Sequence, residues 1–153
     1  MRNQSSLVLL IEDNPDHADL IKSCLLLHPQ VREVVRLADG DQALDFLSDH
    51  RSDTATSAGT RCIPNLILLD LRLPKVDGLE VLRRFRIDEQ FAGTPIVVLS
   101  SSHAKQDIEE AYRLGADAYA VKPLDYGKLQ QMIFTTCSFW FAWNDARLAE
   151  MTV

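Results

Sequence analysis

The sequence predicts an α/β fold in which helices cover both faces of a doubly wound, five-stranded parallel sheet. Along the 153 residues, five short apolar runs alternate with five longer segments whose apolar residues recur at helical spacing. Several of the runs are apolar throughout, which is typical of strands buried on both faces. Strict alternation of strands and helices favours parallel strands joined by right-handed crossovers.

The five strand candidates are short and rich in branched or large aliphatic side chains. In chain order they are Leu7–Ile11, Glu33–Leu37, Leu66–Leu69, Ile96–Leu99 and Ala118–Val121. Most of them are bounded by Pro, Gly, Asp or Ser, which favour turns. Each run therefore predicts one strand of the sheet.

The segments between these runs predict helices. In chain order they are Asp16–Leu27, Gly40–Leu47, Gly78–Ile87, Lys105–Leu114 and the stretch from Tyr126 onward. In the third segment, Leu79, Leu82 and Phe85 recur at helical spacing. Gly115 follows the fourth segment, where a glycine suits the C-terminal cap of a helix.

The chain is expected to form one domain over residues 1–153 with no output domain, because its length fits a single ordinary domain. The core is expected over about 6–131. A polar insert over 49–64 is longer than the ~2–6 residues usual between such elements. An extended aromatic helix and tail are expected over 132–153.

The composition disfavours several classes of protein. There are 16 basic and 22 acidic residues, and a net charge of −6 repels a phosphate backbone, so we expect no nucleic-acid partner. No apolar stretch approaches the ~20 residues that span a bilayer, so we expect no membrane partner. Cys24, Cys62 and Cys137 form no close pair or metal-ligand spacing, which fits the reduced thiols of a cytoplasmic protein.

Polar groups follow four of the five predicted strands. Glu12 and Asp13 follow the first, Asp70 the third, the hydroxyl run Ser100–Ser102 the fourth and Lys122 the fifth. The second strand brings no comparable group, as expected of an edge strand. Because ligands of open α/β sheets bind beyond the carboxyl ends of the strands, these side chains should share one rim.

The chemistry of this rim suits phosphoryl transfer to a carboxylate. Carboxylates brought together repel each other unless a cation lies between them. Hard oxygen ligands with open positions suit Mg²⁺, for which Mn²⁺ or Ca²⁺ can substitute. Lys122 offers a compact positive charge and Ser100 a donor to a phosphoryl group. Together these groups predict a reaction that depends on positioning and charge neutralisation.

Each of these groups alone has a simpler interpretation. An acidic pair after a strand can be a solvated turn or a helix start, where Asn14 or Asp16 could be the cap. Serines after a strand usually cap the next helix, and a Lys-Pro pair is usually a strand end. The joint occurrence at four strand ends favours the functional interpretation.

Four stretches resemble the receiver domain of two-component response regulators. They are Leu7–Ile21, Pro64–Arg86, Pro95–Ser102 and Gly115–Leu129. The resemblance implies a flavodoxin-like (βα)₅ receiver fold with strand order 2-1-3-4-5. The polar insert and the aromatic C-terminus look more like the single-domain regulators paired with phytochrome-type histidine kinases. The implied partner is therefore a sensor histidine kinase of bacteriophytochrome-like type.

The resemblance also implies roles for the acidic residues. Asp70 corresponds to the phosphoacceptor. The implied Mg²⁺ ligands are Glu12, which acts partly through water, Asp13, Asp70 and the backbone carbonyl of Arg72. Position 72 is often a smaller polar residue in the family. Arg72 is therefore expected to contact the phosphoryl group or an acidic neighbour and to alter the access of hydrolytic water.

The resemblance assigns the remaining rim residues to a switch. Lys122 pairs with the phosphoryl oxygens, Ser100 is the switch hydroxyl and Tyr119 the switch aromatic. The alternative for Tyr119 is a half-buried strand aromatic with no such role. The Lys122–Pro123 peptide bond is expected to be cis, which a proline permits at modest cost.

The C-terminal segment concentrates five of the eleven aromatic residues within ten positions. They are Phe134, Phe139, Trp140, Phe141 and Trp143. At helical spacing Phe134 and Ile133 could face the core, whereas the other four aromatics cannot all do so. An exposed aromatic cluster usually marks an interface, so we expect a homodimer through the last helix. Packing of the cluster against the tail over 145–153 is the alternative.

Two rival functions fit the sequence less well. An aspartyl phosphatase needs a second Asp two positions after its nucleophile, where this chain has Arg72, which cannot lose its proton. A nucleotide- or flavin-binding domain needs a phosphate cradle after the first strand, where the acidic IEDNPD would repel phosphate. The sequence therefore favours a signalling phosphoacceptor, with self-catalysed phosphotransfer and autodephosphorylation, over an enzyme.

Overall fold

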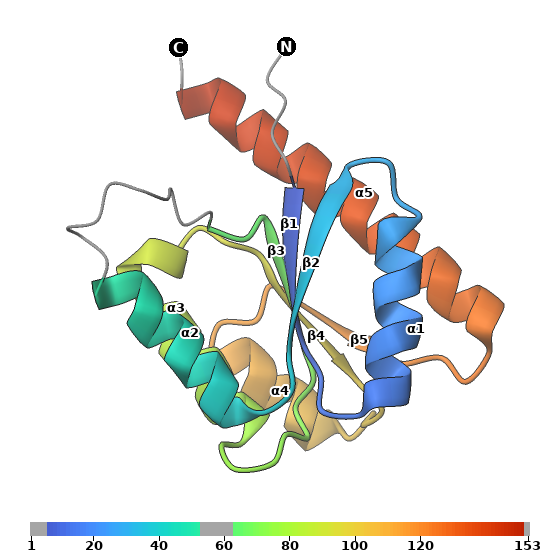
Figure 1. Ribbon diagram of the computed structural model, residues 1–153, viewed down its shortest axis with the longest axis horizontal. Coiled ribbons are helices and arrows are strands. Elements are labelled where there is room, and N and C mark those ends of the chain that lie inside the picture. The colour runs from blue at the N-terminus through green and yellow to red at the C-terminus, as the bar shows by residue number, and fades with distance from the viewer. Residues whose placement is uncertain (1–5, 53–62, 152–153) are drawn as a thin grey trace.

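The computed structural model describes residues 6–52 and 63–151 and has the predicted α/β architecture (Figure 1). Its elements are β1 (Ser6–Ile11), α1 (Pro15–Leu26), β2 (Val31–Leu37), α2 (Gly40–Ser52), β3 (Leu66–Leu69), α3 (Gly78–Ile87), η1 (Glu89–Phe91), β4 (Ile96–Ser100), α4 (Lys105–Arg113), β5 (Ala118–Val121) and α5 (Tyr126–Met151). The helix predicted to end at Leu47 continues through Ser52, so residues 49–52 of the expected insert are helical. Most of the insert, residues 53–62, lies outside the described part.

The sheet has five parallel strands in the order β2-β1-β3-β4-β5, which confirms the predicted topology. Helices α1 and α5 lie on one face, and α2, α3 and α4 on the other (Figure 1). Alternate residues of β1 enter the two cores: Leu10 packs in the layer of α1 and α5, whereas Leu9 and Ile11 pack in the opposite layer. This double burial explains why β1 is apolar throughout.

Local signals determine where the helices begin and end. The side chain of Asn14 caps α1, because its Oδ1 accepts from the backbone N–H groups of Asp16 at 2.9 Å and His17 at 3.1 Å. Gly115 follows α4 with φ +106°, a conformation that glycine adopts without strain. The expected glycine cap is therefore present, one residue beyond Leu114.

A close approach of two loops requires glycine at position 40. A Cβ added to Gly40 would lie 2.3 Å from the backbone oxygen of Val76. The start of α2 therefore touches the loop between β3 and α3. That loop follows Asp70, so the contact supports one side of the rim.

Two local expectations are wrong. The Lys122–Pro123 bond is trans, as are the other peptide bonds of the described residues. Only ~0.5–1 kcal/mol separates the two isomers before proline, so the local sequence does not decide between them. The second error concerns residues 89–91, where no element was predicted. The short helix η1 buries Phe91 against Phe85, with ring centroids 5.2 Å apart.

The prediction for the aromatic residues of α5 is also partly wrong. Ile133 is buried as expected. The other four aromatics do not all face the core, since Phe141 is only 3% exposed but Phe139 and Trp143 are exposed. Phe134, which was expected to face the core, is 44% exposed. The reason is that α5 packs on α1 as well as on the sheet. The ring of His28, just after α1, lies 4.6 Å from that of Phe134 and 5.6 Å from that of Phe141. None of the described helices is long and apolar enough to cross a membrane.

Candidate functional site

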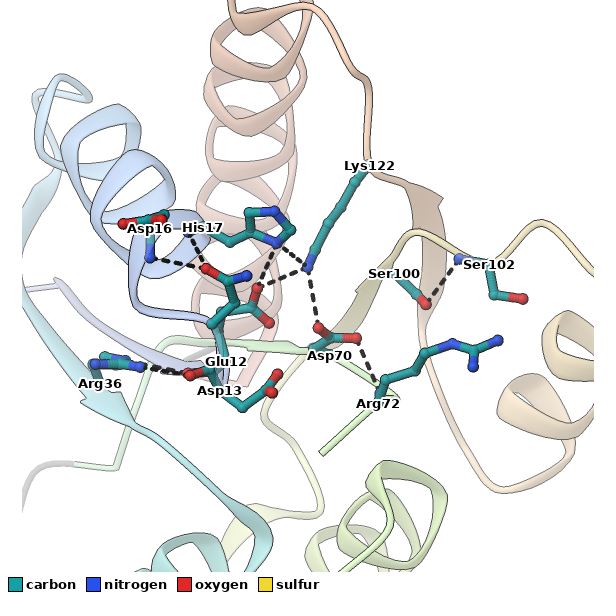
Figure 2. Close-up of polar contacts among 11 residues, drawn as sticks. Glu12, Asp13, Asp16, His17, Arg36, Asp70, Arg72, Ser100, Ser102 and Lys122 are labelled. Carbon is teal, nitrogen blue, oxygen red and sulfur yellow. Dashed lines mark hydrogen bonds and ion pairs between the residues drawn. The ribbon is translucent and has the colours of Figure 1, made fainter. Parts of the chain in front are cut away.

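Three carboxylates converge where β1 and β3 end. Ile11 pairs with Leu69 in the sheet, and the N–H of Asp70 donates to Ile11 O at 2.9 Å. Glu12 and Asp70 therefore leave adjacent strands at the same level. Glu12, Asp13 and Asp70 each offer an oxygen atom, and these atoms lie within 4.8 Å of one another. The structure thus brings the three predicted acidic residues together (Figure 2).

Lys122 bridges two of these carboxylates. Its backbone N–H donates to Ser100 O at 2.8 Å, so the residue leaves the sheet directly beside β4. Its Nζ donates to Glu12 Oε1 at 2.8 Å and to Asp70 Oδ2 at 3.1 Å (Figure 2). The Lys122 side chain is only 11% exposed. Burial opposes its charge, but the two carboxylates outweigh burial and raise the pKa of Lys122.

The pKa values of the two buried carboxyl groups, Glu12 and Asp70, are shifted in different ways. Burial, with the neighbouring Asp70, raises the pKa of Glu12 to about 8. Burial acts in the same direction on Asp70, but hydrogen bonds from Glu12 and from the Arg72 N–H, together with Lys122, lower the pKa of Asp70. The pKa values of these two neighbouring carboxyl groups therefore shift in opposite directions, although Lys122 contacts both of them.

These residues fit a divalent metal ion. Glu12 Oε2 is buried and has no hydrogen-bond partner among the described residues. A buried carboxylate oxygen without a donor favours a cation beside it. The donors are all hard oxygen atoms, which suits Mg²⁺ and Mn²⁺.

Ser100 and Tyr119 are linked through Ser102. The fully buried Ser100 Oγ accepts from the Ser102 N–H at 3.2 Å. The carbonyl of Ser102 accepts from the Tyr119 hydroxyl at 2.7 Å. A displacement of the Ser100 hydroxyl would break its hydrogen bond with the Ser102 N–H. Ser102 is also the residue whose carbonyl binds the Tyr119 hydroxyl. The sequence placed Ser102 in the run of hydroxyl residues after the fourth strand but gave it no role of its own.

Arg72 lies at the mouth of the site. Its backbone N–H donates to Asp70 Oδ1 at 3.1 Å. Its exposed side chain lines an open pocket of about 520 Å³ with residues that include Asp13 and Asp107. The predicted contact with an acidic neighbour is not formed among the described residues, where the guanidinium has no hydrogen-bond or ion-pair partner.

Two further residues contact the acidic pair and were missed in the sequence. His17 Nδ1 lies 3.1 Å from Glu12 Oε1 and 3.4 Å from Lys122 Nζ. Its position in the first turn of α1, five residues after Glu12, is the signal that could have revealed it. Arg36 on β2 donates to the backbone carbonyls of Glu12 and Asp13, each at 3.1 Å. The second strand was expected to bring no group comparable to those of the other strands, and Arg36, which lies within it, reaches only the backbone of the acidic pair.

Comparison with known families identifies the type of protein. The family model of the response regulator receiver domain matches residues 8–134. The chain belongs to this family. Receiver domains are signalling phosphoacceptors rather than conventional enzymes, and the acidic cluster at the rim is typical of the receiver metal site.

Several receiver proteins are similar to this chain over most of its length. The probable methanogenesis regulatory protein FilR2 of Methanothrix harundinacea is 37% identical, covering 90% of this chain and 85% of that protein. Response regulator Rcp1 of Synechocystis is 33% identical, covering 90% of both chains, and its solved Mn²⁺-bound form gives a TM-score of 0.76. The phosphorylated cyanobacterial phytochrome response regulator RcpA is 34% identical, with a TM-score of 0.78, and covers 90% of this chain and 94% of that one.

Proposed function

We propose that Asp70 accepts a phosphoryl group from a sensor histidine kinase and that this modification switches a protein-interaction surface. The observation that carries the proposal is the Lys122 ammonium between Glu12 and Asp70 at the rim. One buried cation and three carboxylates provide the charges needed to receive both a metal ion and a phosphoryl group. The low pKa of Asp70 keeps this side chain deprotonated and therefore nucleophilic.

In the transfer, a carboxylate oxygen of Asp70 attacks the phosphorus of a kinase phosphohistidine, and the P–N bond breaks as the imidazole leaves. The residues that would hold Mg²⁺ are Glu12, Asp13, Asp70 and the backbone carbonyl of Arg72. When bound, Mg²⁺ neutralises charge on the phosphoryl oxygens. Lys122 keeps its position and pairs with a phosphoryl oxygen after the transfer.

The switch would begin at Ser100. A phosphoryl group adds roughly −1.5 to −2 charge and three acceptor oxygens at the rim. When the Ser100 hydroxyl turns to donate to it, Ser102 loses its hydrogen bond to Ser100 Oγ. The change passes to Tyr119 through the Ser102 carbonyl and biases the surface formed by α4, β5 and α5.

Relatives support a more specific kinase partner. RcpA is a cyanobacterial phytochrome response regulator, and the similarity covers 90% of this chain and 94% of that one. We therefore propose a bacteriophytochrome-like histidine kinase as the phosphodonor. The buried free thiols of Cys24 and Cys137 support a cytoplasmic location.

The exposed face of α5 supports a homodimer. Phe134, Phe139 and Trp143 remain 40–58% exposed although they are large and apolar. Phe139, Trp140 and Trp143 contact one another in edge-to-face pairs, with ring centroids 4.9 and 5.5 Å apart. Aromatic clusters of this kind are enriched at protein interfaces. We propose that a second copy of the chain covers them.

Phosphotransfer assays test the proposed function. Purified, autophosphorylated candidate kinases are mixed with the wild-type protein or Asp70→Asn in the presence of Mg²⁺. We expect label to pass to the wild-type protein and not to the variant. A variant that accepts label as fast as the wild type would contradict the assignment of Asp70.

A further inference from the structure

One arginine side chain holds the backbone from which both acidic ligands project. Arg36 lies on β2, paired with Leu10 of β1. Its Nε donates to the carbonyl of Glu12 and its Nη2 to the carbonyl of Asp13, each at 3.1 Å. Figure 2 shows the Arg36 side chain to the left of Glu12 and Asp13, on the side away from Lys122.

The position of Arg36 follows from the way β1 ends. The last backbone contact between the two strands is the Glu12 N–H, which donates to Leu37 O at 3.0 Å. After this hydrogen bond the chain leaves the sheet and leads to α1, so the carbonyls of Glu12 and Asp13 have no neighbouring strand to pair with. A guanidinium presents several N–H donors in a rigid, planar fork, so one side chain can bind two successive carbonyls.

The choice of acceptor matters for the metal site. The hydrogen bonds of Arg36 go to backbone oxygens, whereas the carboxylate oxygens of Glu12 and Asp13 stay available to a cation. The arginine therefore orients the acidic pair without neutralising it by direct pairing. Lys122, in contrast, donates to the carboxylate groups themselves.

We propose that Arg36 is a positioning residue for the divalent-cation site, which acts by fixing the backbone of Glu12 and Asp13. The inference rests on the proposed function, because it assumes that these two residues bind the cation. Groups that orient metal ligands from outside typically change metal affinity by about 10–100-fold when they are replaced. Without the Arg36 guanidinium, the binding of the metal ion must itself order the backbone of Glu12 and Asp13. The free-energy cost of this ordering weakens metal binding.

Direct metal binding tests the proposal without any phosphoryl transfer. Mn²⁺ binding is measured by electron paramagnetic resonance on the wild-type protein, Arg36→Gln and Arg36→Lys. We expect the affinity for Mn²⁺ to fall about tenfold in Arg36→Gln. Arg36→Lys keeps the charge but not the fork, so its affinity should stay well below that of the wild type.

Arg32→Gln is the matched control. Arg32 is an exposed residue of the same strand, four positions earlier, and its replacement removes the same charge. We expect wild-type affinity in this variant. Thermal unfolding without metal verifies that each variant is folded. If Arg36→Gln does not fold, the comparison of Arg36→Lys with the wild type tests the proposal.

A second readout separates positioning from general damage. With acetyl phosphate as donor, the Mg²⁺ concentration for half-maximal phosphorylation should rise about tenfold in Arg36→Gln. The rate at saturating Mg²⁺ should change little, whereas a misfolded site would lose that rate as well. Affinities of both Arg36 variants within twofold of the wild type would overturn the role of Arg36, and so would full rescue by lysine. Absence of Mn²⁺ binding in the wild type would instead overturn the metal site of the proposed function.

Discussion

At the residue scale, charge and burial give each side chain of the rim a distinct role. Glu12 and Asp70 are both buried, yet Asp70 keeps its charge because Lys122 and the N–H of Arg72 contact it. Glu12 has one oxygen without a donor among the described residues, which leaves it ready for a cation. Arg72 contributes its backbone to Asp70, while its side chain lines the pocket mouth.

Arg72 is predicted to protect the phosphorylated state. Its long cation at the mouth of the pocket can pair with a phosphoryl oxygen and hinder hydrolytic water. Replacement by the smaller Asn should shorten the lifetime of phospho-Asp70 about fivefold, the effect of roughly 1 kcal/mol on the barrier. This lifetime is measured as the loss of label from the phosphorylated protein after the phosphodonor has been removed. Arg72→Lys, which keeps a long cation, should stay close to the wild type, and unchanged decay in Arg72→Asn would reject the role.

At the element scale, strand ends could be predicted from the sequence, but contacts between elements could not. The apolar run before Asp70 determines both β3 and the place where the carboxylate emerges, so the acidic rim was predictable. Arg36 was missed because its reach to Glu12 depends on the pairing of β1 with β2. Phe134 was assigned to the core wrongly because α5 packs on α1 in addition to the sheet, which places Phe141 inside and Phe134 outside.

The junction between α1 and α5 should be sensitive to pH through His28. Its Nδ1 accepts from the Gln30 N–H at 3.2 Å and its Nε2 lies 2.9 Å from Ser138 Oγ, so the ring is bound as the neutral form. Burial lowers the pKa of His28 below its ordinary value of 6.5. The folded state therefore prefers the neutral ring. This stabilisation is complete above pH 6.5 and is lost as the pH falls below it.

Urea unfolding at several pH values measures this effect. The free energy of unfolding should decrease between pH 7.5 and 5.5 in the wild type, and the decrease should be smaller in His28→Gln. His103→Gln, which changes an exposed histidine in the loop after β4, should keep the wild-type slope. An equal slope in His28→Gln and the wild type would exclude His28 as the cause.

At the scale of the whole molecule, the charged groups and the exposed aromatic residues lie on different parts of the fold. The rim at the carboxyl ends of the strands holds the charged groups. The 26-residue helix α5 runs from that rim along the sheet and carries the aromatic face that we assign to a second copy (Figure 1). A change at β5 reaches this helix directly, because β5 leads into it.

The dimer should depend on the aromatic face of α5. Phe139→Ser removes a ring that is 58% exposed, and loss of a central aromatic anchor typically costs ~2 kcal/mol or more of binding, or about 30-fold in affinity. Light scattering over a concentration series measures the change. Ile87→Ser removes an equally exposed apolar side chain at the end of α3 and should leave the assembly unchanged. A wild-type protein that is monomeric at tens of micromolar, phosphorylated or not, would contradict the dimer.

The central claim is that Asp70 is the residue that becomes phosphorylated and that a divalent cation is required. Intact-protein mass spectrometry after incubation with acetyl phosphate tests both parts, with the wild type, Asp70→Asn and, as a control, Asp77→Asn from the loop that follows Asp70. We predict one added phosphoryl group in the wild type and in Asp77→Asn with Mg²⁺, and none in Asp70→Asn or after chelation. Phosphorylation of Asp70→Asn to the wild-type level, or of the wild type without a divalent cation, would contradict the account.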